Sequence, residues 1–280
     1  MPAVLGTNVA SLWASKNLQS AQSNMANSVE RLSSGLRINR ARDDAAGLGI
    51  SNALTQQINS ADQGIRNLND GISIVQTAEG AISQASEMAQ RILTLAVQGQ
   101  SSALSQTQKN SITTEMRSLL NGIDAIQTRT KFGANTTALM GAATISVYSS
   151  KESTDKIDIS AAALTSISTG SAAGTLSTAV TTTASLATDF QSIATAASSY
   201  ITALDTQRGS LGAVQNQMEY SVNNILELSA NLSSARSRIV DTDYAAETAT
   251  LTKGQILQQA ATAMLAQANQ MPNVILSLLK

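Results

Sequence analysis

Three stretches of the sequence carry apolar residues at alternating steps of three and four, and this heptad pattern restricts the fold more than any other property. The series cover 54–96, 112–126 and 186–239, and the last is broken only by the polar Gln207 and Ser221. Such steps align apolar side chains along one face of an α-helix. At 1.5 Å per residue, the 186–239 helix would be about 80 Å long and the 54–96 helix about 65 Å. The pattern predicts a mainly α protein.

The connection at 99–108, GQSSALSQTQ, is short and polar and predicts a turn that folds the second heptad stretch back on the first. The long helix at 186–239 would then pack on both of them. The two prolines, Pro2 and Pro272, leave the interior free of obligatory helix breakers. We therefore expect an antiparallel bundle with the form of a rod.

Between 133 and 185 the composition shifts to Gly, Ser, Thr and Ala. The segments 143–148 and 156–159 alternate apolar and polar residues at a period of two, and the turn at 149–154 separates them. This pattern predicts a small β-hairpin. The segment TGSAAGTLSTAVTTTAS that follows is small and polar, and we expect it to be weakly structured and to lie on the surface.

Composition excludes several classes of function. The sequence has no His and no Cys, which removes the commonest general base, the thiolate nucleophile, the disulfide and most zinc sites. Carboxylate pairs such as Asp43 and Asp44 stand without a catalytic partner or a phosphate-binding loop. Net charge is −1, with seven aromatic residues and no basic block. We expect no enzyme, no metal or cofactor and no nucleic-acid binding.

Both ends of the chain are poor in charge. No charged residue occurs in 254–279, and Lys16 is the only one in 1–29. Apolar residues are spread around these segments, so one partner helix cannot cover them, and burial between copies of the chain resolves the mismatch. The interleaved Gln and Asn would be costly in lipid, which favours self-assembly over membrane insertion. The residues predicted to assemble are Leu18, Met25, Leu32, Leu36, Ile256, Leu257, Met264, Leu265, Ile275, Leu276, Leu278 and Leu279.

Several segments near both ends resemble one known family, bacterial flagellin. Towards the N-terminus they are ERLSSGLRIN at 30–39, ARDDAAG at 41–47 and LNDGISI at 68–74. Towards the C-terminus they are GSLGAVQN at 209–216, SARSRI at 234–239, DYA at 243–245, QILQQA at 255–260 and LAQANQ at 265–270. The resemblance covers roughly 1–132 and 186–280.

The resemblance implies a structural subunit of the bacterial flagellar filament used for swimming, with the two terminal helices forming an inner coiled-coil domain. The expected domains are the coiled-coil parts at 1–45 and 240–280, the rod at 46–132 and 186–239, and the hairpin with its surface segment at 133–185. The chain resembles a minimal flagellin with little or no outer domain. The alternatives are a hook-filament junction protein, or a soluble helical scaffold or type III secreted effector.

The resemblance also implies partners and a location. The N-terminus shows no conventional signal peptide, and flagellins are exported unfolded to the cell exterior by the flagellar type III apparatus, so we expect secretion without a cleavable signal. We expect contacts with a cytosolic export chaperone, the filament cap and the hook-junction proteins. Some flagellins are bound by a vertebrate innate immune receptor through a face of the rod. The matching residues are Gln90, Arg91, Leu95, Gln98 and Glu115, for which we favour contact between subunits.

Overall fold

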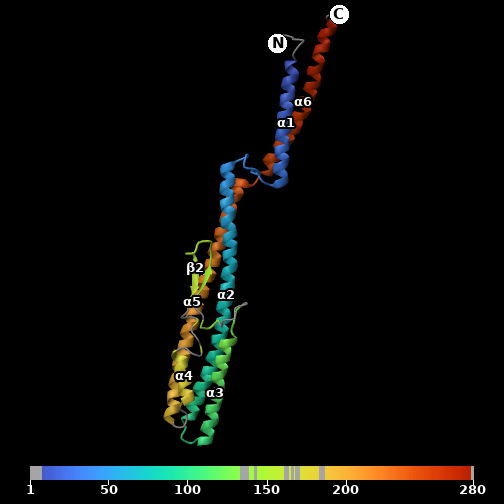
Figure 1. Ribbon diagram of the computed structural model, residues 1–280. Helices are drawn as coiled ribbons and strands as arrows, with labels where there is room; N and C mark the ends of the chain where they lie inside the picture. The colour runs from blue at the N-terminus through green and yellow to red at the C-terminus, as the bar shows by residue number, and fades with distance from the viewer. Residues whose placement is uncertain are drawn as a thin grey trace. The chain divides into compact units, whose positions relative to one another are not determined.

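The computed structural model describes residues 8–132, 139–141, 144–160, 164, 167, 171–182 and 187–278 (Figure 1). Its elements are α1 (Val9–Ser34), α2 (Ala45–Gly99), α3 (Gln106–Arg129), β1 (Ile145–Tyr148), β2 (Lys156–Ile159), α4 (Ser171–Thr182), α5 (Ala187–Val240) and α6 (Tyr244–Leu278). The chain divides into a terminal unit, Met1–Ile58 with Ala230–Lys280, and a central unit, Asn59–Ser229. The prediction of a mainly helical fold with a small hairpin is confirmed.

In the central unit, α3 and α5 both run antiparallel to α2. Arg91 of α2 forms an ion pair with Glu115 of α3 at 2.8 Å, while Glu79 of α2 lies 3.6 Å from Arg208 of α5. The heptad positions face inward as the spacing predicts, because one stripe per helix is removed from water. The heptad residues whose side chains have no exposed surface include Leu68, Val75, Ile82, Met116, Ile193, Ala197, Leu204, Leu211 and Met218.

The predicted hairpin is present and pairs antiparallel, with Ile145 opposite Ile159 and Tyr148 opposite Lys156. Its apolar side chains face the core, where Ile157 and Ile159 are buried. The loop after β1 lies against α2 so closely that a Cβ atom at Gly64 would overlap the carbonyl oxygen of Ser149. Glycine at this position therefore lets the hairpin pack on the helix. Ala143, the first residue of the expected strand, lies outside the described residues.

Residues 171–182 differ from the expectation of a weakly structured surface segment, because they form helix α4. Leu176 and Val180, one helical turn apart, are fully buried in the core of the central unit. The Arg117 guanidinium of α3 also donates to the carbonyl of Thr181 at 3.2 Å. Two apolar side chains at positions i and i+4 are enough to anchor a short helix on a larger bundle. The small polar residues around them had indicated a loop.

In the terminal unit, α1 and α6 form an antiparallel pair. Near one end the side-chain amide of Asn8 donates to the carbonyl of Ala268 at 2.7 Å, and near the other Arg31 lies 3.6 Å from Glu247. The seam between the helices is built from small side chains such as Ala14 and Ala21, which are buried. Small residues let two helix backbones approach closely over several turns. No helix among the described residues has the length and apolar content needed to cross a membrane.

Candidate assembly surface

The predicted assembly residues on α6 divide by exposure. Ile256, Leu257 and Met264 expose 60 %, 48 % and 62 % of their surface, whereas Leu265 is half-buried. Leu257 follows Ile256 directly, and Met264 follows seven residues after Leu257, or about two helical turns. The three exposed side chains therefore form one broad outward stripe. Ile275, Leu276 and Leu278 lie where only the backbone of α6 is described, and Leu279 is outside the described residues.

The predicted residues on the N-terminal side lie differently. Leu18, Met25 and Leu32 are half-buried on α1, at the heptad positions that alternate with the buried Ala14 and Ala21. Leu36, in the linker after α1, is also half-buried. These side chains therefore contribute first to the terminal unit's own α1–α6 pair, and only their remaining surface is open to another molecule.

An exposed apolar stripe that the sequence reasoning missed lies at the start of α1. Val9, Leu12 and Trp13 expose 46 %, 69 % and 58 % of their surface. They stand at i, i+3 and i+4, so they share one face, which points away from α6. The Lys16 ammonium lies 5.2 Å from the centre of the Trp13 ring, in range of a cation–π contact. The spacing was present in the sequence, but the heptad that runs from Leu18 concealed it.

The linker after α1 is fastened to the linker between α5 and α6 by main-chain hydrogen bonds. Leu36 and Asp241 form an isolated antiparallel bridge, in which Arg37 N–H donates to Val240 at 2.6 Å and Thr242 N–H donates to Gly35 at 3.0 Å. The bridge joins segments about 200 residues apart in the sequence. It fixes where α1 ends relative to where α6 begins.

The charged residues of the 37–44 loop are engaged by the backbone of the loop and by the helices around it. The Asp43 carboxylate accepts the N–H groups of Arg40 at 3.0 Å and Asn39 at 3.2 Å. The Arg40 N–H is the main reason that the pKa of Asp43 lies below its usual value, because hydrogen bonds to the charged form favour ionisation. The Arg40 guanidinium pairs with Glu30 of α1 at 2.8 Å. The loop is therefore held in one conformation by its own polar groups.

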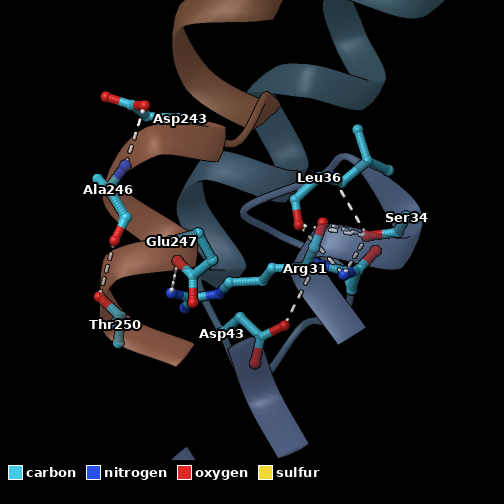
Figure 2. Close-up of polar contacts among 9 residues, drawn as sticks. Arg31, Ser34, Leu36, Asp43, Asp243, Ala246, Glu247 and Thr250 are labelled. Carbon is cyan, nitrogen blue, oxygen red and sulfur yellow. Dashed lines mark hydrogen bonds and ion pairs between the residues drawn. The ribbon is translucent and has the colours of Figure 1, made fainter. Parts of the chain in front are cut away.

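The start of α6 is capped and tied to α1 (Figure 2). The Asp243 carboxylate accepts the N–H groups of Ala245 and Ala246 at 2.9 and 3.2 Å, which satisfies two of the unpaired donors of the first turn. Glu247, one turn further, faces Arg31 of α1. This arrangement places α6 beside α1 with a defined register.

The second predicted surface lies on α2 and α3 in the central unit. Gln90, Arg91, Gln98 and Glu115 are exposed, and the Arg91–Glu115 pair joins the two helices. Leu95 is only 2 % exposed, and its side chain packs in the core of the bundle. Four of the five residues thus face solvent and form a polar face rather than an apolar one.

Nothing in the described part of the chain resembles a metal centre, since no group of three or more His, Cys, Asp or Glu residues is placed to hold an ion. The features that stand out are the exposed apolar stripes on α1 and α6. A helical protein with such terminal faces belongs to the class of self-associating structural proteins.

The model of the bacterial flagellin N-terminal helical region matches residues 5–144, and that of the C-terminal helical region matches residues 193–279. A flagellin of Halalkalibacterium halodurans is 36 % identical over 281 residues, which cover 99 % of this chain and all of the relative. A flagellin of Bacillus subtilis is also 36 % identical, with 98 % of each chain covered, and Flagellin B of Vibrio cholerae is 32 % identical over 371 residues. The chain belongs to the bacterial flagellin family and is a subunit of the flagellar filament.

Proposed function

We propose that this flagellin polymerises through the exposed apolar faces of its terminal helices. The observation that carries the proposal is the α6 stripe of Ile256, Leu257 and Met264, which is exposed within a segment that has no charged residue from 254 to 279. Burying apolar surface yields roughly 25 cal/mol per Å². A helix that presents such a stripe gains stability when another copy covers it, and it repels no partner by charge.

The experiment is seeded polymerisation of the full-length chain and of a chain cut back to residues 45–240, followed by sedimentation and negative-stain microscopy. Long filaments from the full-length chain alone would support the terminal helices as polymerisation surfaces. Filaments from both chains would place those surfaces in the central unit and overturn the proposal.

The same stripe supports an export chaperone as a partner. A free subunit with exposed Ile256 and Met264 would aggregate before it reached the filament, so a cytosolic chaperone that covers α6 fits the chemistry of the surface. We propose export by the flagellar apparatus without a cleavable signal, and contacts with the filament cap and hook-junction proteins at the ends of the polymer. Protection of Met264 from oxidation by a co-purified chaperone would support this step, and unchanged oxidation would count against it.

For the α2–α3 face we propose contact between neighbouring subunits, with recognition by a vertebrate innate immune receptor as the second candidate. The face is polar and exposed. Because both side chains of the Arg91–Glu115 ion pair are about half exposed, the pair stabilises the fold by only about 0–1 kcal/mol. The variant Gln90→Ala/Gln98→Ala should fold normally yet polymerise more slowly. Normal polymerisation together with lost receptor signalling would favour the second candidate.

The flagellin family is structural, and we propose that this chain has no enzymatic activity of its own. The sequence offers no His or Cys to serve as general base or nucleophile. The Asp43 carboxylate of the linker accepts two backbone N–H donors. A hydrolase activity that co-purified with the chain and was lost in Asp43→Asn would contradict this proposal.

A further inference from the structure

A hollow of about 430 Å³ opens on the flank of the α1–α6 pair. We call it the α1–α6 hollow; its lining is largely polar, with Asn24, Arg31, Glu247 and Lys253 beside the small or apolar Ala21, Gly254 and Leu257. The space exists because Ala21 and Gly254 occupy the seam where larger side chains would otherwise meet. The volume lies in the range that binding sites use, about 300–1,000 Å³.

The glycine in this hollow is not required by packing within the chain. A Cβ atom at Gly254 would meet its nearest neighbour, Cβ of Met25, at 3.6 Å, which is an ordinary van der Waals distance. Glycine inside a helix costs roughly 0.5–1 kcal/mol relative to alanine. The terminal unit therefore carries a helix-weakening residue in the lining of the hollow, buried against α1, that relieves no clash with the rest of the chain.

The chain also carries a side chain suited to fill such a space. Trp13 is the only tryptophan of the sequence, and it is exposed with Leu12 on the face of α1 that points away from α6. Exposing a large aromatic side chain forgoes its burial free energy. Tryptophan is also enriched among the residues that carry most of the binding energy at protein interfaces.

We propose that Trp13 of one subunit inserts into the α1–α6 hollow of a second copy of the chain. The inference rests on the proposed function, because it requires that copies associate through their terminal units. Ala21 and Leu257 supply apolar contact for the ring, and the Lys253 cation suits its face, while Arg31 is paired with Glu247 in the same lining. The side-chain amide of Asn24 offers an oxygen acceptor for the indole N–H.

Trp13 and the α1–α6 hollow lie at different levels of the terminal unit. Trp13 and Asn24 are separated by eleven positions on α1, or about 17 Å along the helix. Eleven positions are about three helical turns, so Trp13 and Asn24 lie on nearly the same side of α1 and are separated along the helix axis. The contact joins two different patches, once in a head-to-tail array or twice across a two-fold axis.

The size of the contact sets its strength. A stable pair of proteins buries about 800 Å² on each partner through roughly 20–30 residues. The surface that Trp13, Leu12 and Val9 can bury together is far smaller than that. Two subunits joined through this contact alone do not stay together, and the contact forms when a subunit enters an array that supplies others.

The first test uses Trp13 as its own probe during seeded polymerisation of the wild-type chain. Insertion predicts an emission maximum at shorter wavelength and at least a threefold drop in iodide quenching in the filament. An unchanged spectrum and unchanged quenching would overturn the proposal. The variant Asn24→Phe fills the hollow and should slow polymerisation at least tenfold, while Ser23→Phe, exposed on a different face of α1, should not.

The second test identifies the partner surface by disulfide cross-linking, for which the cysteine-free chain offers a clean background. A Lys16→Cys chain and a Lys253→Cys chain, copolymerised and oxidised, should give covalent dimers only when mixed. Thr248→Cys, near the same level of α6 but on a different face, should give none with Lys16→Cys. Filaments without the Lys16–Lys253 cross-link would overturn this pairing and leave the proposed function standing. A wild-type chain that forms no filaments would instead count against the proposed function.

Discussion

The backbone of Leu36 pairs with that of Asp241 in a single antiparallel bridge that joins the linkers on either side of the α1–α6 pair. The bridge depends on Gly35, which ends α1 with a φ of 73° and whose carbonyl accepts the N–H of Thr242. The left-handed conformation costs a residue with a Cβ atom roughly 1–2 kcal/mol. A glycine at the end of the helix thus allows the chain to turn into the bridge.

The substitution Gly35→Ala should therefore lower the stability of the terminal unit by about 1–2 kcal/mol. A Cβ atom at this position would also lie 3.1 Å from the Tyr244 hydroxyl oxygen. Thermal melting of filaments followed by circular dichroism measures the loss. The double variant Gly35→Ala/Tyr244→Phe separates the two causes, since it relieves the contact and keeps the backbone strain. Full recovery in the double variant would show that backbone strain is negligible.

The Asp43 carboxylate should make the 37–44 loop sensitive to acid. Its pKa is lowered in the folded chain, first by the N–H of Arg40, from a usual value of 3.8. A depressed pKa means that ionised Asp43 stabilises the fold above pH 3.8 and that this contribution is lost as pH falls through the folded pKa. Carboxyl NMR should find Asp43 titrating below 3.8. A value at or above 3.8 would contradict the hydrogen bonds to Asn39 and Arg40.

Two glycines of α2 should respond to alanine in opposite ways. A Cβ atom at Gly64 would overlap the Ser149 carbonyl, so Gly64→Ala should destabilise the central unit by about 1–3 kcal/mol and displace the hairpin. At Gly80 a Cβ atom would meet nothing within 4 Å, so Gly80→Ala should stabilise the chain by about 0.5–1 kcal/mol. Urea unfolding of both variants measures the difference. Equal effects would contradict the close approach of hairpin and helix.

Helix α4 should behave as part of the core. Leu176 has no exposed surface, so Leu176→Ala should cost about 2–5 kcal/mol in urea unfolding. The matched control is Gly174→Ala on the same helix, where a Cβ atom would meet nothing within 4 Å and where alanine should stabilise by about 0.5–1 kcal/mol. A Leu176→Ala chain as stable as the wild type would show that the 171–182 segment is dispensable for folding.

Most of the fold was predictable because its long helices carry strong periodic patterns. Leu68, Ile82, Leu204 and Met218 follow steps of three and four that only a helix can bury on one side, and all four are fully buried. The hairpin was predictable because Val147 and Ile157 alternate with polar residues between turn signals. Alternation and heptad spacing are local properties, so a single sequence reveals them.

Features that depend on a few residues, or on contacts distant in sequence, were harder to predict. Leu176 and Val180 are only two apolar anchors in a segment of small residues, and they become significant only once α3 and α5 are in place. The stripe of Val9, Leu12 and Trp13 follows a helical spacing, but whether a helix face is covered depends on its partner. The bridge between Leu36 and Asp241 pairs residues about 200 positions apart, which local pattern cannot reveal.

The most direct test of the account is seeded polymerisation of a full-length chain whose α6 stripe has been made polar, with Ile256→Ser, Leu257→Ser and Met264→Ser. Its control carries Gln255→Ser, Gln259→Ser and Gln267→Ser, which change exposed positions of the same helix without removing apolar surface. We predict that the control polymerises like the wild type, while the polar-stripe variant remains in the supernatant after sedimentation. Filaments of normal length from the polar-stripe variant would contradict the claim that the exposed face of α6 drives assembly.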